Sequence, residues 1–269
     1  MSPTLTLATL GILQGLTEFL PVSSSGHLVL VQSWLPSFQE PGVLFHATVH
    51  LATLGAVLLY FRRDVVVLAC AALRPRASDP DAVRLLGLVV AGTLPTALIG
   101  LLFKDGLERL FSSVPTAASM LLVTGALLVA TDRVRGQGAD IERMRVWHAL
   151  LIGLVQGMAI IPGVSRSGAT VAAGVLSGLG RDLALRYSFL LSIPAILGAF
   201  TLQLLSHGLA GAPDINGFGY AAAFLAAFVT GYLGIEVLLR VLLSRRLGWF
   251  ALYCWGLGLT VLITRSLSG

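Results

Sequence analysis

Long apolar stretches leave this chain few ways to fold. Six of them are long enough to cross a bilayer as helices, namely 43–61, 84–103, 114–131, 183–206, 219–243 and 249–266. A helix of about 20 residues at 1.5 Å rise spans roughly 30 Å, the thickness of the hydrocarbon layer. Only 12% of the 269 residues are charged, whereas a soluble domain is about a quarter charged. The sequence therefore predicts an all-α, polytopic membrane protein, with residues 1–269 forming a single integral membrane domain.

Two further apolar regions are interrupted by polar and helix-breaking residues. Region 5–36 is broken at Pro21–Gly26, and region 147–180 is broken at Pro162–Gly168. Each half is short for a span, so each region is predicted to be a re-entrant hairpin of two short helices. Irregular backbone at membrane depth is tolerated where it is buried in protein or lines a wet cavity. The sequence thus places two polar tips inside the membrane domain.

The two interrupted regions resemble each other. An offset of 142 residues aligns Gly11–Leu28 with Gly153–Thr170 and gives seven identities in eighteen positions. Three predicted spans lie between the copies, so the copies enter the membrane from opposite faces. This predicts an inverted-topology repeat, about 1–131 and 147–269, an architecture known from transporters with a site near the midplane. Both copies also carry a Gly-x-x-x-Gly pair, which predicts close helix packing.

The basic residues are distributed unevenly across this predicted topology. Fourteen of the eighteen Lys and Arg residues fall on one side, and only Lys104, Arg109 and Arg265 fall on the side of the termini. Cytoplasmic loops carry an excess of Lys and Arg, so loops 62–83 and 132–146 are predicted to be cytoplasmic and both termini outside. The net charge of +5 therefore reports orientation and gives no case for nucleic acid.

Charged side chains at the two tips are predicted to pair. Gln14 and Glu18 are four residues apart and share one helix face. A carboxylate within a membrane segment costs about 2.5–3.5 kcal/mol on insertion scales, so it persists with a partner or a function. Arg166, in the other tip, is the predicted partner. An ion pair that only ties the two tips together is the structural alternative.

Hydroxyl groups surround these charges and favour an anion-binding site. The first tip holds Ser23, Ser24, Ser25 and His27, and the second holds Ser165, Arg166, Ser167 and Thr170. Helix N-termini, hydroxyls and the guanidinium fork all donate hydrogen bonds to phosphate oxygens. Helix capping is the alternative role for the serines. His27 follows Ser24 by three residues, so one helical turn would bring the imidazole near that hydroxyl as a general base. His50, in an apolar span, is predicted to serve packing, and a position on the cavity is the alternative.

The stretches QGLTEFLPVSSSGH and IPGVSRSGAT resemble the two signature motifs of the undecaprenyl-diphosphate phosphatase family, the bacitracin-resistance type. The resemblance covers essentially the whole chain, and Gln14 stands where the family pattern has Glu or Gln. It implies hydrolysis of undecaprenyl diphosphate to undecaprenyl phosphate and inorganic phosphate, which recycles the lipid carrier of peptidoglycan synthesis and confers bacitracin resistance. It further implies a divalent cation, Mg²⁺ or Ca²⁺, with Glu18 as its candidate ligand. The expected location is the bacterial cytoplasmic (inner) membrane, with the site open to the outer face.

Residue chemistry and resemblance together give each candidate a role. Glu18, Ser24, His27 and Arg166 are predicted to be catalytic; the predicted phosphate-binding residues are Gln14, Ser23, Ser25, Ser165, Ser167 and Thr170. Attack by Ser24 with His27 as base and attack by an activated water both remain open. The partners are a polyprenyl diphosphate lipid and the bilayer, and a homodimer is compatible with the sequence. The alternative function is a transporter or flippase of a phosphorylated lipid or another anionic substrate.

Overall fold

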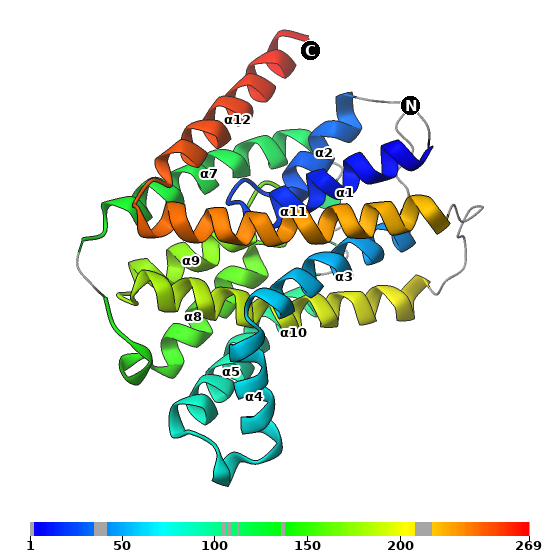
Figure 1. The fold of residues 1–269 in the computed structure, drawn as a ribbon. Helices are drawn as coiled ribbons and strands as arrows, with labels where there is room; N and C mark the ends of the chain where they lie inside the picture. The colour runs from blue at the N-terminus through cyan, green and yellow to red at the C-terminus, as the bar shows by residue number, and fades with distance from the viewer. Residues whose placement is uncertain are drawn as a thin grey trace.

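Every named element in the part of the chain that the structure describes is a helix (Figure 1). This computed structural model describes residues 3–34, 42–103, 106, 109–111, 113–135, 138–207 and 217–268. The elements are α1 (Pro3–Phe19), α2 (Ser24–Trp34), α3 (Gly42–Tyr60), α4 (Arg62–Leu73), η1 (Pro75–Ala77), α5 (Pro80–Leu102), α7 (Val114–Arg133), η2 (Ile141–Arg143), α8 (Val146–Met158), α9 (Arg166–Leu176), α10 (Arg181–His207), α11 (Gly217–Leu243) and α12 (Gly248–Ser268). The predicted all-α class is confirmed.

Five helices are long and apolar enough to cross a membrane, namely α5, α7, α10, α11 and α12. They coincide with five of the six predicted spans. The sixth, 43–61, is occupied by α3, whose apolar stretch Phe45–Tyr60 is shorter than a full span. The predicted loop 62–83 contains a further helix, α4, with Asp64 in its first turn. The Asp64 carboxylate stabilises the positively charged N-terminus of α4. This segment, which the basic residues predict to be a loop, is therefore helical.

Both predicted interruptions are gaps between helices, and each ends earlier in the chain than predicted. The gap between α1 and α2 is residues 20–23, and the gap between α8 and α9 is residues 159–165. The serine that precedes each second helix, Ser23 or Ser165, accepts a hydrogen bond at 3.2 Å from the N–H three residues later. Because these caps start the helices early, the last polar residues of each predicted tip form a first helical turn.

Glycines of the repeat allow the interrupted pairs to pack closely on long helices. Helix α1 packs along α11, and α8 packs along α5. A Cβ at Gly11 would collide with the Ala223 carbonyl oxygen, and a Cβ at Gly153 would collide with the Gly92 carbonyl oxygen. The two backbones therefore touch at these points, which confirms the close packing that the Gly-x-x-x-Gly pairs predict.

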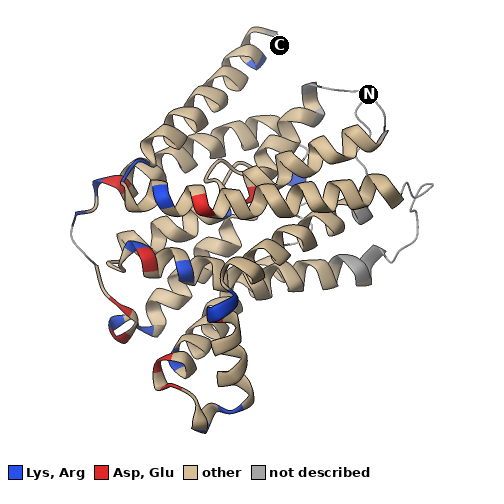
Figure 2. Ribbon diagram, viewed as in Figure 1, with Lys and Arg blue, Asp and Glu red and all other residues tan. Residues whose placement is uncertain are grey.

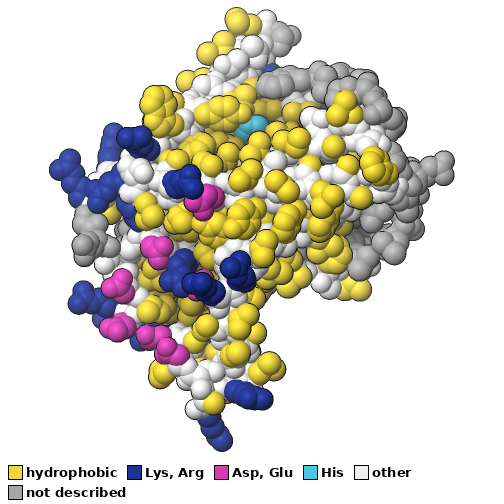
Figure 3. All heavy atoms as spheres, viewed as in Figure 1, with side chains coloured by type: hydrophobic (Ala, Val, Ile, Leu, Met, Phe, Trp, Pro, Cys, Tyr) yellow, Lys and Arg dark blue, Asp and Glu magenta, His cyan; other side chains and the backbone are white. Residues whose placement is uncertain are grey.

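Most charged side chains gather at one end of the molecule (Figure 2), and apolar side chains cover much of the face that Figure 3 shows. Figure 2 shows Lys, Arg, Asp and Glu concentrated around α4, the start of α10 and the junction of α11 with α12. Figure 3 shows hydrophobic side chains over the long helices between the two ends. The exposed residues there include Leu94 and Leu98 of α5 and Leu233 of α11. An apolar belt of this kind suits a protein surrounded by lipid, and the molecule is a multi-pass membrane protein.

The contact between α5 and α8 gives a direct test of this packing. Gly153→Ala should lower the midpoint of thermal unfolding in detergent, because the added methyl must push the two backbones apart at a cost of about 1–3 kcal/mol. Gly87→Ala is the matched control on α5, since a Cβ there meets nothing within 4 Å. An unchanged midpoint in Gly153→Ala would contradict the close contact.

Candidate active site

The two gaps between helices touch each other through Ser23. Its hydroxyl oxygen accepts a hydrogen bond from the Gly163 N–H at 3.2 Å and donates to the Val164 carbonyl at 3.3 Å. Ser167 makes the reciprocal contact, donating from Oγ to the Phe19 carbonyl at 2.9 Å. Ser23 and Gly163 both have positive φ, +68° and +95°, which is rare for a residue with a side chain. The contact between the gaps thus holds Ser23 in an unusual backbone conformation.

Two helices begin at this junction with the same local arrangement. Ser23 Oγ lies 3.3 Å from Ser25 Oγ at the start of α2, and Ser165 Oγ lies 3.3 Å from Ser167 Oγ at the start of α9. These serines are equivalent positions of the sequence repeat. The first turns of both helices carry N–H groups without intrahelical partners and the positive end of the helix dipole. An anion at the junction would meet hydroxyl and amide donors from both copies.

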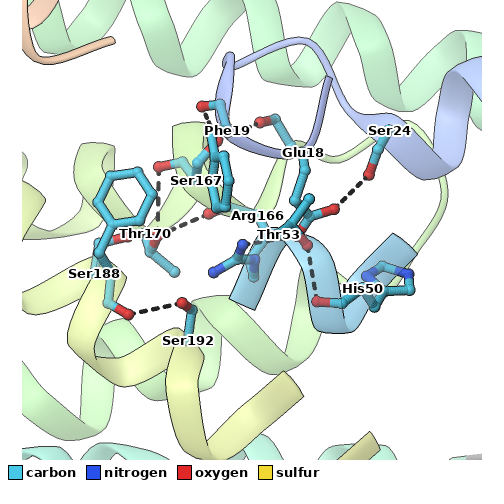
Figure 4. Close-up of polar contacts among 12 residues, drawn as sticks. Glu18, Phe19, Ser24, His50, Thr53, Arg166, Ser167, Thr170, Ser188 and Ser192 are labelled. Carbon is cyan, nitrogen blue, oxygen red and sulfur yellow. Dashed lines mark hydrogen bonds and ion pairs between the residues drawn. The ribbon is translucent and has the colours of Figure 1, made fainter. Parts of the chain in front are cut away.

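Glu18 connects the two copies, as Figure 4 shows. Arg166 Nη2 donates to Glu18 Oε1 at 2.8 Å across 148 residues of sequence. Ser24 Oγ donates to Glu18 Oε2 at 2.9 Å, and Gln14 Nε2 donates to the same oxygen at 3.1 Å. The Glu18 side chain is only 8% exposed and that of Arg166 only 16%. The predicted pairing of Glu18 with Arg166 is confirmed.

A cavity of about 470 Å³ opens at this junction. Seven of the ten predicted site residues line it, namely Gln14, Glu18, Ser23, Ser24, Ser25, Ser165 and Arg166. The other wall is largely apolar and includes Phe111, Ile196 and Phe200. The cavity therefore combines a polar region at the two helix starts with an apolar side.

The other three predicted site residues are not among the residues that line this cavity. Thr170 Oγ1 donates to the Arg166 carbonyl at 2.7 Å and lies against Ser188 Oγ, and Ser167 donates to the first gap as described. The Thr170 hydroxyl therefore binds the Arg166 backbone, and the Ser167 hydroxyl ties the start of α9 to the end of α1. Phosphate binding by Ser167 and Thr170 stays a prediction.

His27 does not approach Ser24 in the way that the spacing suggested. Its Nδ1 lies 2.7 Å from the Ser23 carbonyl oxygen and its Nε2 lies 2.6 Å from the Tyr253 hydroxyl. Among the described residues, the hydrogen bond of the Ser24 hydroxyl goes to Glu18 instead. The geometry thus offers Ser24 a carboxylate as its proton acceptor, and a catalytic role for His27 stays a prediction.

Two histidines of α3 line the cavity although the sequence analysis did not place them in the site. His46 and His50 are both cavity residues, and His50 Nδ1 lies 3.5 Å from Gln14 Nε2. His50 was interpreted as a packing residue because its surroundings in the sequence are apolar. The two imidazoles are four residues apart and so share one face of a helix. Two histidines four residues apart in an apolar span are the sequence feature that could have predicted this polar helix face.

The described residues do not form a metal site by themselves. They contain no group of three or more His, Cys, Asp or Glu side chains that could hold a metal ion. Glu18, the candidate ligand, already accepts hydrogen bonds on both oxygens, from Arg166 on one and from Ser24 and Gln14 on the other. A resident cation held by protein ligands alone does not fit this arrangement.

Fold and site together define a class of protein. This is a multi-pass helical membrane protein with a buried carboxylate, a guanidinium, several hydroxyls and two helix N-termini gathered on one cavity. The family model described as "Bacitracin resistance protein BacA" matches residues 7–260. The chain belongs to this family.

Several proteins that share the name "Undecaprenyl-diphosphatase" are similar to this chain over nearly its whole length. The one from Syntrophotalea carbinolica is 45% identical over 93% of this chain and 94% of its own. The one from Desulfosudis oleivorans is 46% identical over 93% and 94%. The one from Carboxydothermus hydrogenoformans is 42% identical over 96% and 95%. The family match, over residues 7–260, includes both interrupted regions and the residues that line the cavity.

The buried pair predicts a strong coupling between Glu18 and Arg166. Glu18→Gln and Arg166→Gln should each lower the thermal midpoint in detergent markedly, because removing one partner leaves a buried charge unpaired at a cost of about 3–5 kcal/mol. The double variant should lose less than the sum of the two. Arg240→Gln is the control, since it breaks an exposed pair in which Arg240 is 75% exposed and such pairs contribute little. Additive losses in the double variant would show that the two groups do not interact.

Proposed function

We propose that this protein hydrolyses undecaprenyl diphosphate to undecaprenyl phosphate and inorganic phosphate. The family and the shared name of its relatives support this substrate and this reaction. In a bacterium the reaction recycles the lipid carrier of peptidoglycan synthesis and confers resistance to bacitracin. The cavity supports the same conclusion, because its polar region suits a diphosphate and its apolar side suits the first part of a lipid tail.

The observation that carries the proposal is the set of contacts on Glu18. One oxygen of its carboxylate holds Arg166 and the other accepts the hydroxyl proton of Ser24. A nucleophile, a proton acceptor and a cation suited to phosphate oxygens are thus within hydrogen-bond reach of one another at two helix N-termini. A site that only binds an anion would not need a carboxylate beside it, because a carboxylate repels the ligand.

This geometry favours covalent catalysis. The Ser24 oxygen attacks the terminal phosphorus, its proton passes to Glu18, and the bond from that phosphorus to the bridging oxygen breaks to release undecaprenyl phosphate. Arg166, released from Glu18 once that carboxylate is protonated, binds the transferred phosphoryl group together with the N–H groups of α2 and α9. Water then cleaves the phosphoserine, with Glu18 returning the proton to Ser24. Ser23, Ser25, Ser165 and Gln14 orient these groups.

A divalent cation, Mg²⁺ or Ca²⁺, is proposed to enter with the diphosphate. Mg²⁺ in particular is usually held by substrate phosphates together with one or two carboxylates, and Glu18 is the carboxylate on this cavity. When bound, the ion would neutralise part of the charge on the diphosphate. This agrees with the lack of a cage of protein ligands among the described residues.

The proposed arrangement in the membrane has six spans and two re-entrant hairpins. The five long apolar helices and α3 supply the spans, while α1 with α2 and α8 with α9 supply the hairpins. Equivalent serine caps in the two hairpins and equivalent glycine contacts on α1 and α8 support an inverted repeat of about 1–131 and 147–269. The whole chain is proposed to act as one domain.

The proposed orientation in the cytoplasmic membrane places the charged end inside the cell. The basic residues at the start of α4, in 133–145 and at the junction of α11 with α12 support it (Figure 2). The cavity then opens towards the outer, periplasmic face. In the same orientation the segment 207–218, between the predicted spans 183–206 and 219–243, is proposed to lie outside; most of it is beyond the described residues.

A phosphate-release assay with purified protein in detergent tests the function. Wild-type protein should release phosphate from undecaprenyl diphosphate, lose this activity with a chelator, and regain it with Mg²⁺ or Ca²⁺. Ser24→Ala should abolish release, and acid quenching of the wild type should trap phosphoserine at Ser24. Ser33→Ala on the same helix is the control, because its hydroxyl only donates to the Leu30 carbonyl.

Two other outcomes have distinct meanings. A Ser24→Ala protein slowed only about 10²–10³-fold, the usual loss for one hydrogen-bond donor, with no trapped phosphoserine in the wild type, would show that water attacks instead. A protein that binds the lipid but releases no phosphate would be a transporter or flippase.

The native cysteines allow a test of orientation. Cys70, exposed on α4, should resist a membrane-impermeant thiol reagent added outside intact cells and react after the membrane is made permeable. Cys254 is buried and serves as the unreactive control. In a Cys70→Ser background, Ser266→Cys near the end of α12 should react from outside. Labelling of Cys70 in intact cells would reverse the orientation.

A further inference from the structure

The contacts of His27 indicate which of its ring nitrogens carries a proton. Nδ1 faces the Ser23 carbonyl oxygen at 2.7 Å, and a carbonyl only accepts, so Nδ1 carries a proton. In the neutral ring, Nε2 then holds the lone pair, and the Tyr253 hydroxyl donates to it at 2.6 Å. In a charged ring neither nitrogen has a lone pair. In both states His27 has no free position for the proton of an attacking hydroxyl.

Helix α12 reaches the first gap at two consecutive residues. The Tyr253 ring stacks on the His27 ring, with centroids 5.6 Å apart and planes 2° from parallel. Its neighbour Cys254 is fully buried and directs its thiol at the Pro21 carbonyl oxygen, 3.7 Å away. The gap between α1 and α2 is thus held from one side by α12, at Pro21 and, through His27, at Ser23.

Helix α12 is itself fixed on α7, which holds the other gap. Trp255 Nε1 donates to the Leu122 carbonyl at 3.0 Å. On α7, the Thr124 hydroxyl donates to the Gly163 carbonyl at 2.9 Å and accepts the Ser165 N–H at 3.0 Å. The pair of α7 and α12 therefore fixes both gaps relative to each other.

We propose that Tyr253 is a positioning residue, which acts through His27 on the Ser23 carbonyl and so sets the place of Ser24 in the cavity. His27 is then a link in this chain of contacts rather than the base of the reaction. Ser23 needs such support because its φ of +68° is unusual for a residue with a side chain. The catalytic part of this inference rests on the proposed phosphatase activity.

Tyr253→Phe removes the hydroxyl and keeps the stacked ring. We expect kcat to fall about 10- to 100-fold, since a displacement of about 1 Å at a reacting group costs on the order of 10²-fold. KM should stay within about twofold, because Tyr253 does not line the cavity. Tyr60→Phe is the matched control, as its hydroxyl makes an equally short bond of 2.6 Å to Glu236 on the charged end. A kcat for Tyr253→Phe within twofold of wild type would overturn the proposal.

Substitutions of His27 separate positioning from proton transfer. In His27→Asn the amide nitrogen can take the place of Nδ1 and donate to the Ser23 carbonyl, whereas in His27→Gln it reaches the place of Nε2. His27→Asn keeps the contact to the Ser23 carbonyl but loses the one to Tyr253, so we expect it to lose about as much kcat as Tyr253→Phe. His27→Gln and His27→Ala lose the contact to Ser23, and we expect both to lose clearly more than His27→Asn. If His27 were the base, all three would lose about 10²–10⁴-fold alike, and that result would refute the positioning role.

Hydrogen exchange gives a readout that does not depend on activity. Amides of residues 20–27 should exchange faster in Tyr253→Phe than in wild type or Tyr60→Phe, because the gap has lost a support. Unchanged exchange would overturn the proposal even if the enzyme is slowed. A wild-type protein that releases no phosphate from undecaprenyl diphosphate would instead refute the proposed function, and exchange alone would then decide whether Tyr253 holds the gap.

Discussion

The hydroxyl of Ser23 sits where two breaks in the helical structure meet, and it bonds to the backbone of both. Lipid offers no hydrogen bonds, so the free N–H and C=O groups at such breaks need partners within the protein. Ser23 supplies them to Gly26, Gly163 and Val164, while Ser167 supplies one to Phe19. Backbone groups left free in each gap between helices therefore find hydrogen-bond partners in the other gap. The cavity lies at this junction, where the two gaps meet.

The same junction gives the site its chemistry. The starts of α2 and α9 bring donors for an anion, and the end of α1 brings the carboxylate that joins Ser24 to Arg166. A buried ion pair adds little stability by itself, since desolvation offsets much of the attraction. Its value in this molecule is that it holds a hydroxyl and a guanidinium at fixed places around one cavity. The same contacts of Glu18 thus hold the structure together and arrange the groups of the site.

Sequence reasoning found the parts of this arrangement that follow from general constraints. A carboxylate in an apolar segment needs a partner, which identified Arg166, and the internal repeat identified both breaks. It did not find the partners that depend on tertiary packing. Spacing placed His27 beside Ser24, but Tyr253, 226 residues further on, binds the imidazole instead. His46 was missed, and packing was preferred to a cavity position for His50, because an apolar span masks a polar face. Helix α4 was missed because its basic residues are typical of a loop.

The separation of Glu18 and Arg166 along the chain has a consequence for biosynthesis. A ribosome adds about 5–20 residues per second, so the 148 residues between them take roughly 7–30 s to make. During this interval the first copy has neither the guanidinium for its carboxylate nor the backbone groups that complete Ser23. Ser24 and Gln14 can bond one oxygen of Glu18 during this time, but the other oxygen has no Arg166. The ion pair can therefore form only after α9 has been made, and a nascent chain that ends before α9 leaves the Glu18 carboxylate without its guanidinium partner.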